Sequence, residues 1–168
     1  MNGFHRLETR LGPILAAFDA TGVVLYLGFA EHEFRTSVQA RVAGLGPTDA
    51  PPAEALARLQ TQLDAYADGR IRSFDVPFHL HGSAFEQRVW AALLRIPYGE
   101  TRTYGQLAEA LGGRSLSRAV GRANGANPIS ILVPCHRVIG ADGSLTGYAG
   151  GLAMKARLLR IERVVGSG

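Results

Sequence analysis

The chain has 168 residues but only one cysteine, Cys135. A single thiol cannot form a disulfide within the chain, which is typical of proteins in the reducing cytosol, and it cannot build a cysteine-rich zinc site. Long apolar runs are also missing: no stretch approaches the roughly 20 residues that span a bilayer, and residues 1–6 lack the apolar segment of a signal peptide. These absences predict a cytoplasmic protein without a membrane segment or an internal disulfide.

Acidic residues are scarce in the second half of the chain. Residues 85–168 contain eleven Lys and Arg against five Asp and Glu, whereas residues 1–84 contain seven against nine. The positive surplus in one half indicates contact with a polyanion, and nucleic acid is the polyanion that we expect. The alternative is a chance imbalance on a solvated surface.

The residues that are present indicate an α+β fold. Apolar residues make up 46% of the chain and charged residues 19%, which is ordinary for a globular protein, and the length suits one compact domain or two small ones. Two strand-like runs, residues 13–18 and 23–29, flank turn-forming residues at 19–22, which predicts a hairpin.

A helix and a further strand follow in the first half. Residues 74–80 alternate like a strand, and Pro77 favours a position at a sheet edge. Before them, Gly69 is placed to end a helix whose apolar face has helical spacing. The residues of that face are Leu56, Leu59, Leu63 and Tyr66. We take residues 1–82 as an N-terminal α+β domain.

The pattern changes near residue 82. Ser83 and Glu86 have the spacing of a capping box, which predicts the start of a helix. This helix would end at Pro97 and bury Phe85, Val89, Leu93 and Ile96. Residues 83–168 are therefore predicted to form a second, mostly helical domain.

Two short helices joined by glycines predict a helix-turn-helix in this second domain. Thr103 can cap a helix over residues 104–111, and Ser115 or Ser117 can cap another over residues 118–123. The second helix of such a motif is the one that enters DNA. Helical hairpins that only pack within a protein are the alternative.

Arg118 lies early in the second of these helices, next to small residues that let its backbone approach another surface closely. The ordinary role for such an arginine is a solvated surface charge. The more specific alternative is an arginine that inserts into the duplex and fills the place of an extruded base.

The reactive chemistry centres on Cys135, which has His136 as its neighbour. The thiolate is the nucleophilic form of cysteine, and nearby hydrogen-bonding or positive groups favour it. A buried, unreactive cysteine is the alternative. Downstream, residues 146–151 form a glycine-rich loop against which a flat ligand could stack, and a final helix from Leu152 carries Lys155, Leu158, Leu159 and Glu162.

Six ordered motifs surround this cysteine: Ile96-Pro97-Tyr98-Gly99-Glu100, Thr103-Tyr104-Gly105-Gln106-Leu107-Ala108, Arg118-Ala119-Val120-Gly121, Asn127-Pro128, Ile131-Leu132-Val133-Pro134-Cys135-His136-Arg137-Val138-Ile139-Gly140 and Thr146-Gly147-Tyr148-Ala149-Gly150-Gly151-Leu152. Together they resemble the O6-alkylguanine-DNA alkyltransferases of bacterial type, also called methylated-DNA–protein-cysteine methyltransferases. The resemblance is dense over residues 83–168. It is looser over residues 1–82, where residues 11–15 are similar to the family's opening strand.

This resemblance implies a small ribonuclease H-like domain followed by a helix-turn-helix alkyltransferase domain. It implies direct reversal of DNA alkylation, in which Cys135 attacks the alkyl carbon on guanine O6, or on thymine O4, and is consumed in a single turnover. By the same resemblance, His136 draws off the thiol proton through a water molecule and Glu162 orients the imidazole. Tyr104 donates a proton to guanine N3.

The resemblance also implies contacts with the damaged base. Tyr148 and the backbone amide of Ala149 bind O6, and the backbone carbonyls of Cys135 and Val138 accept hydrogen bonds from the guanine amino group. Some relatives have a hydroxyl residue where Ala149 stands. Because the backbone amide makes the contact, we expect little loss.

Further implied features concern DNA and metal. Arg118 fills the place of the flipped base, Asn127 braces the active-site turn, and the helix-turn-helix binds the minor groove of double-stranded DNA. A monomer without cofactor is expected, and cooperative binding on DNA is left open. Some relatives hold a structural zinc partly through cysteines, which this chain lacks, so no metal is expected. His79 and His81 are expected to be solvated rather than metal ligands.

Two other functions fit parts of the chain. A cysteine hydrolase would use Cys135, His136 and Glu162 as a triad and turn over an ester or amide, but it leaves the helix-turn-helix and the charge asymmetry unexplained. A non-catalytic protein that binds or regulates at alkylated DNA is the second alternative. Relatives of that kind replace the nucleophile, commonly with tryptophan, whereas Cys135 is present here.

Overall fold

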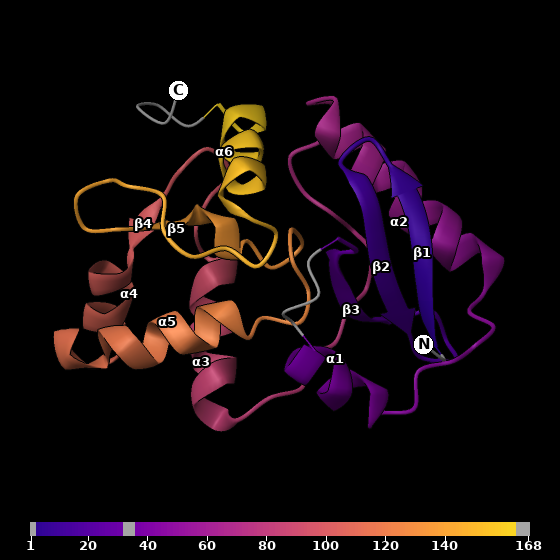
Figure 1. Ribbon diagram of the computed structural model, residues 1–168, viewed down its shortest axis with the longest axis horizontal. Coiled ribbons are helices and arrows are strands. Elements are labelled where there is room, and N and C mark those ends of the chain that lie inside the picture. Colours follow the sequence, from indigo (N-terminus) through magenta and orange to yellow (C-terminus); the bar gives the residue numbers. More distant parts are fainter. Residues whose placement is uncertain (1–2, 32–35, 164–168) are drawn as a thin grey trace. The chain divides into compact units, whose positions relative to one another are not determined.

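The computed structural model describes residues 3–31 and 36–163 and shows the mixed α and β fold that the sequence predicts (Figure 1). The chain divides into two compact units. The first consists of Met1–His81 with Pro128–Leu132, and the second of Gly82–Asn127 with Val133–Gly168. A short segment from the second half of the sequence therefore belongs to the first unit. The domain boundary at residue 82, as a division into parts that fold on their own, stays a prediction.

The first unit is built on a three-stranded antiparallel sheet in the order β1-β2-β3. Its strands are β1 (Phe4–Thr9), β2 (Gly12–Phe18) and β3 (Val24–Phe29). The predicted hairpin is confirmed as β2 and β3, and Asp19 Oδ1 holds its turn by accepting from the amides of Thr21 and Val23 at 2.9 and 3.0 Å. β1 precedes this hairpin and was not predicted from the sequence. Apolar and polar residues do not alternate regularly in β1, and Leu7 is its one buried residue.

Two helices complete this unit. α1 (Thr36–Ala43) contacts β3, and α2 (Ala53–Ala67) contacts β1, as the violet and purple ribbons of Figure 1 show. The predicted helix is α2, with Leu59, Leu63 and Tyr66 buried. It ends before Gly69, which adopts a φ of +73° that suits glycine. Val38 and Val42 of α1 pack with a sheet cluster formed by Ala17, Leu25 and Tyr26.

The prediction of a strand over residues 74–80 was wrong. This segment forms only a single parallel bridge, between Phe78 and Val24 of β3. The Val24 amide donates to the Pro77 carbonyl at 2.9 Å and the His79 amide donates to the Val24 carbonyl at 3.0 Å. A longer ladder is not formed there, and Pro77, which has no amide proton, limits the pairing.

A second bridge on β3 involves the segment that leads to the cysteine. Leu27 pairs with Ile129, with hydrogen bonds of 2.9 Å from the Leu27 amide to Pro128 and from the Ser130 amide to Leu27. Ile131 then has a φ of +75°, and the Leu132 amide donates back to Ser130 at 2.9 Å. This tight turn is strained for a β-branched residue, so the backbone is locally constrained four residues before Cys135.

The second unit opens with α3 (Ala84–Leu94), whose predicted capping box is confirmed. The Glu86 amide donates to Ser83 Oγ at 3.1 Å, and the Ser83 amide donates to the Glu86 carboxylate at 2.9 Å. Of the residues predicted to be buried, Val89, Leu93 and Ile96 are buried and Phe85 is half-buried.

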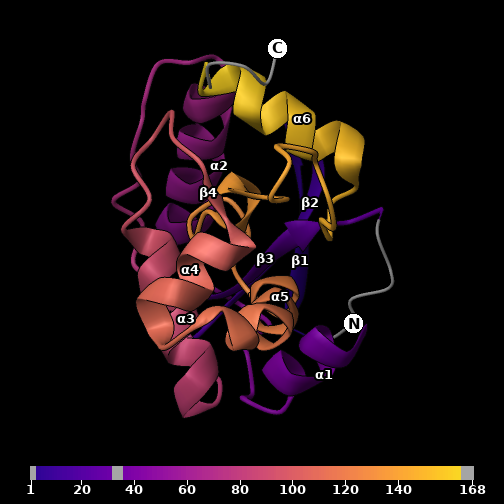
Figure 2. The same cartoon turned by 90° about the vertical axis from the view of Figure 1, so that its left-hand side faces the viewer.

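Helices α4 (Tyr104–Leu111) and α5 (Ser117–Gly125) follow, and they contact each other and α3 (Figure 2). Thr103 caps α4 as predicted, with Gln106 completing a capping box. The caps predicted for the second helix were wrong: a 3-10 turn (Arg114–Leu116) leads into α5, and Ser117 Oγ donates to the Arg114 carbonyl at 2.7 Å. α5 also continues to Gly125, two residues beyond the helix predicted over residues 118–123. The helix-turn-helix assignment stays a prediction.

The rest of the second unit surrounds the cysteine. Strands β4 (Arg102–Thr103) and β5 (Val138–Ile139) pair in parallel, a 3-10 turn covers Cys135–Arg137, and α6 (Leu152–Ile161) ends the described chain. Trp90 of α3 is fully buried and donates from Nε1 to the Ala123 carbonyl of α5 at 2.8 Å. None of the helices in residues 3–31 and 36–163 combines the length and the apolar content needed to cross a membrane.

Candidate active site around Cys135

Cys135 opens the 3-10 turn that ends at Arg137 and is only 5% exposed. The Arg137 amide donates to the Pro134 carbonyl at 3.0 Å and closes this turn. Asn127, which is buried, donates from Nδ2 to the Val133 carbonyl at 2.9 Å. Asn127 thus holds the backbone two residues before the thiol, as a brace would.

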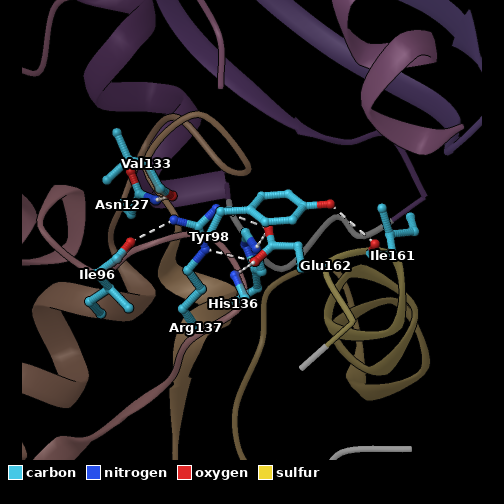
Figure 3. A network of polar contacts seen from close by, with 9 residues as sticks. Ile96, Tyr98, Asn127, Val133, His136, Arg137, Ile161 and Glu162 are labelled. Atoms are coloured by element: carbon cyan, nitrogen blue, oxygen red, sulfur yellow. Dashed lines mark hydrogen bonds and ion pairs between the residues drawn. The ribbon is translucent and has the colours of Figure 1, made fainter. Parts of the chain in front are cut away.

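His136 is fully buried, and its Nε2 lies 2.7 Å from Glu162 Oε2 (Figure 3). A carboxylate only accepts hydrogen bonds, so Nε2 carries the proton and Nδ1 keeps its lone pair when the imidazole is neutral. Nδ1 is buried and has no hydrogen-bond partner among the described residues. Burial lowers the pKa of His136 and outweighs the opposing effect of Glu162, so the ring is a neutral base at physiological pH.

Glu162 is buried directly after the last residue of α6, where the partial negative charge of a helix end disfavours a carboxylate. Arg137 compensates with two hydrogen bonds, from Nε to Oε1 at 2.8 Å and from Nη2 to Oε2 at 3.0 Å. The pair is a bidentate clamp, which fixes the plane of the carboxylate that faces His136. Arg137 was not assigned a role from sequence.

The guanidinium of Arg137 is itself held in place from two other sides. Its Nη1 donates to the Ile96 carbonyl at 2.7 Å, and its Cζ lies 5.7 Å from the ring centre of Tyr98 (Figure 3). The Tyr98 hydroxyl donates to the Ile161 carbonyl at 3.2 Å. The segment after α3 and the end of α6 therefore jointly orient the carboxylate.

Lys155 is fully buried, and its ammonium donates to the Thr146 carbonyl at 2.7 Å. Burial lowers the pKa of Lys155 to about 8, and attraction to Cys135 opposes that shift. At neutral pH it is a buried cation whose charge favours the thiolate form of Cys135. Sequence reasoning missed this role, although Lys155 shares a helical face with buried Leu158 and Leu159, a spacing that could have indicated its burial.

The stability of the chain should respond to Lys155 at alkaline pH. Below pH 8 Lys155 is charged in both the folded and the unfolded chain, so the cost of burying that charge fully reduces the free energy of unfolding. Between pH 8 and its ordinary value of 10.5, the folded chain prefers the neutral form. Wild type should therefore gain about 3 kcal/mol in free energy of unfolding relative to Lys155→Met over this range. Denaturant titrations of both proteins at pH 7.5 and 10.5 measure it, and a pH-independent difference would contradict it.

Tyr104, the first residue of α4, contributes a hydroxyl to the same neighbourhood. It donates to the Thr146 carbonyl at 3.4 Å, so Tyr104 and Lys155 share one acceptor. Burial raises the pKa of Tyr104, and a negative Cys135 raises it further. The phenol is therefore protonated at neutral pH and able to donate.

The other residues expected at the site lie on three different elements. Arg118 is exposed in the first turn of α5, and Val138 is buried in β5. Tyr148 and Ala149 are half-buried in the loop before α6, where the Gly151 amide donates to the Tyr148 carbonyl at 2.9 Å.

Metal ligation has no support in residues 3–31 and 36–163, where no group of three or more His, Cys, Asp or Glu side chains could hold an ion. His79 and His81 are exposed in the first unit, and their rings stack with centres 4.2 Å apart.

The chain is similar to several known proteins. The family described as 6-O-methylguanine DNA methyltransferase, DNA binding domain, matches residues 84–164. A methylated-DNA–protein-cysteine methyltransferase of Mycobacterium tuberculosis is 59% identical over 102 residues, which is 61% of this chain and 62% of that protein. The chain thus matches less than two thirds of that relative's length.

Other similarities extend over nearly the whole chain. A methylated-DNA–protein-cysteine methyltransferase of Methanosarcina acetivorans is 46% identical over 155 residues, covering 92% of this chain and 94% of that protein. The crystal structure of Mycobacterium tuberculosis OGT in complex with DNA has a TM-score of 0.79 and 42% identity, covering 95% of this chain and 92% of the other.

Proposed function

Because the chain belongs to the methylated-DNA–protein-cysteine methyltransferase family, we propose that it repairs DNA by transferring the alkyl group of O6-alkylguanine irreversibly to Cys135. The observation that carries this proposal is the buried hydrogen bond between Glu162 and His136, the residue that follows Cys135. Glu162 binds one nitrogen of the His136 ring at 2.7 Å, and the other is buried without a partner among the described residues.

The first step is activation of the thiol. His136 Nδ1 takes the proton of Cys135 Sγ, directly or through one water molecule, and Glu162 stabilises the imidazolium that forms. Buried Lys155 stabilises the thiolate. This step needs assistance because an isolated thiol is mostly protonated at neutral pH.

Alkyl transfer is an in-line displacement. The new bond joins Sγ to the alkyl carbon while the bond from that carbon to O6 breaks, and the electron pair passes to the guanine. Tyr104 donates a proton to guanine N3 to neutralise that charge, and its raised pKa keeps it in the donating form. The S-alkylcysteine is proposed to be stable, so each chain acts once.

The contacts with the base follow the family's pattern. We propose that Tyr148 and the Ala149 amide bind O6, that the carbonyls of Cys135 and Val138 accept from the guanine amino group, and that Asn127 braces the turn. The hydrogen bond from Asn127 to Val133 supports the last of these roles.

DNA is the proposed partner, supported by the DNA-binding family model and by the similarity to a structure with bound DNA. Insertion of Arg118 in place of a flipped base, minor-groove binding and action as a monomer are further parts of the proposal. Reaction with O4-alkylthymine and a cytoplasmic location stay predictions.

The decisive experiment is a mass measurement. The protein is mixed with a DNA duplex that contains one O6-methylguanine, and the masses of the peptides from the protein are measured by mass spectrometry. We expect one added methyl group on the Cys135 peptide and an equal amount of restored guanine, with neither in Cys135→Ala. Restored guanine with an unmodified Cys135 would contradict the proposal. Turnover without a stable adduct would indicate a hydrolase, and binding without transfer would indicate a non-catalytic lesion binder.

A further inference from the structure

The positive charge of Arg137 has no part in the proposed mechanism, although it lies beside the carboxylate that binds His136. The Arg137 side chain is 11% exposed, and the side chains of His136 and Glu162 are fully buried. Charges shielded from water interact strongly, because little solvent screens them. A charge in this position acts on the proton of His136 as well as on the orientation of Glu162.

One oxygen of Glu162 has two donors at once. Oε2 lies 2.7 Å from His136 Nε2 and accepts from Arg137 Nη2 at 3.0 Å (Figure 3). The other oxygen, Oε1, accepts from Arg137 Nε at 2.8 Å and from the Gly99 amide at 3.5 Å. The guanidinium therefore offsets a negative charge that would otherwise act on the imidazole alone.

The guanidinium is held in this arrangement by its third nitrogen. Arg137 Nη1 donates to the Ile96 carbonyl at 2.7 Å, and Cζ lies 5.7 Å from the ring centre of Tyr98. Each of the three nitrogens thus has an acceptor, so the group cannot turn away from Glu162 without breaking hydrogen bonds. The positive charge is a fixed part of the site.

Without that charge, Glu162 and His136 would together bind one more proton at neutral pH. A buried carboxylate that lacks a cation is costly, and uptake of a proton by the pair relieves that cost. If the proton stays on His136, the ring is an imidazolium with no lone pair. If it moves to Glu162, the acid donates to Nε2 and the ring proton lies on Nδ1. In both cases Nδ1 loses the lone pair that must accept the thiol proton.

The groups around His136 act on it in opposite directions. Burial lowers the pKa of the ring most, the hydrogen bond and charge of Glu162 raise it, and the positive charges of Arg137 and Lys155 lower it. Glu162 and Lys155 come from the end and the middle of α6, and Arg137 comes from the 3-10 turn that also carries Cys135. Arg137 is the cation that contacts the carboxylate directly.

We propose that Arg137 keeps His136 neutral before the reaction by offsetting the negative charge of Glu162, so that Nδ1 accepts the Cys135 proton at neutral pH. Arg137 is then a positioning residue that acts through Glu162 and touches neither the thiol nor the base of the DNA. An uncharged ring at the working pH is the form that general-base catalysis requires. This inference rests on the proposed function.

The test compares two replacements of Arg137. Arg137→Gln removes the charge and keeps a hydrogen-bond donor, whereas Arg137→Lys keeps the charge and loses the planar fork. Single-turnover transfer to Cys135 is measured with the full chain at a saturating O6-methylguanine duplex, from about pH 5 to about pH 9. We expect the acidic midpoint of this profile to rise by about one pH unit or more in Arg137→Gln. In Arg137→Lys it should stay within about 0.3 unit of wild type.

The matched control is Arg95→Gln, the same change at an exposed position one residue before Ile96, which should leave the midpoint unchanged. A lower rate at every pH with an unchanged midpoint in Arg137→Gln would show that the guanidinium only orients the carboxylate, and it would overturn the inference. Equal shifts in Arg137→Gln and Arg137→Lys would also overturn it, because the charge would then not be the cause.

A second measurement reads the ring itself and needs no DNA. Nitrogen NMR of the chain with 15N-labelled histidine, assigned by the signals lost in His136→Gln, should show a neutral His136 protonated at Nε2 at neutral pH in wild type. If Arg137→Gln does not fold, that neutral ring supports the inference and a cationic ring overturns it. Wild type that leaves Cys135 unmodified would refute the proposed function, whereas the NMR titration would still measure the effect of Arg137 on His136.

Discussion

Replacing Glu162 by glutamine is expected to slow methyl transfer to Cys135 by about 100-fold. The amide has nearly the same shape but carries no charge, so the imidazolium of His136 loses the partner that lies 2.7 Å away. The glutamine NH2 can also face His136 and shift the ring proton to Nδ1, which removes the lone pair that accepts the thiol proton. Both effects act on the base and leave the thiol in place.

The same change should lower the free energy of unfolding by about 3 kcal/mol. Arg137 makes two of its hydrogen bonds to Glu162, and its side chain is only 11% exposed, so its charge would lose its buried partner. Rapid-quench assays at saturating DNA measure the rate, and chemical denaturation measures the stability.

Glu109→Gln is the matched control for this prediction. Glu109 is an exposed carboxylate on α4 that pairs with Arg114 at 3.6 Å, so its loss should change neither quantity measurably. A Glu162→Gln protein that transfers methyl within threefold of wild type would show that the carboxylate does not assist His136.

Replacing Arg118 by alanine is expected to slow repair of O6-methylguanine in duplex DNA by about 100-fold while free O6-benzylguanine reacts as before. The side chain is exposed in the first turn of α5 and is proposed to fill the gap that a flipped base leaves in the stack. Without it, the damaged base returns to the duplex more readily, whereas a free base needs no extrusion. Equal losses with both substrates would remove the base-flipping role.

Arg122→Ala controls for charge in the Arg118 experiment. Arg122 is also exposed on α5, four residues further along the helix. If Arg122 only contacts phosphate, its loss should weaken DNA binding, with little effect on the rate at saturating DNA. The slope of the logarithm of the binding constant against the logarithm of salt concentration should become shallower by about one. Arg118→Lys should recover binding more than rate, because a lysine keeps the charge but not the planar group.

Local features of this fold could be predicted because their partners lie a few residues apart. The capping boxes of Ser83 with Glu86 and of Thr103 with Gln106 each span three residues, and both are present. The Asp19 turn is equally local. β1 was not predicted because its residues are largely polar. Such a segment forms a strand because it pairs with a neighbouring strand, here β2, and its own sequence does not indicate that pairing.

The second helix is present, but the prediction of its cap failed for a related reason. Ser115 and Ser117 both have cap-forming side chains, but the chain enters α5 through a 3-10 turn in which neither serves as the cap. The longer helix then carries Asn124 into the second unit's interior. Which face of a helix is buried depends on the elements that pack against it, and these come from elsewhere in the chain.

By itself, the sequence pointed to Cys135 and His136 as the proposed nucleophile and base, and the motifs around them determined the family. The tertiary structure alone decided which charges and amides surround that pair. Arg137 reaches Glu162 across 25 residues, Lys155 reaches Thr146 across 9, and Asn124 reaches Cys135 across 11. Such contacts depend on the folded path of the backbone, which sets the distances and the burial that make a charge or a hydrogen bond effective.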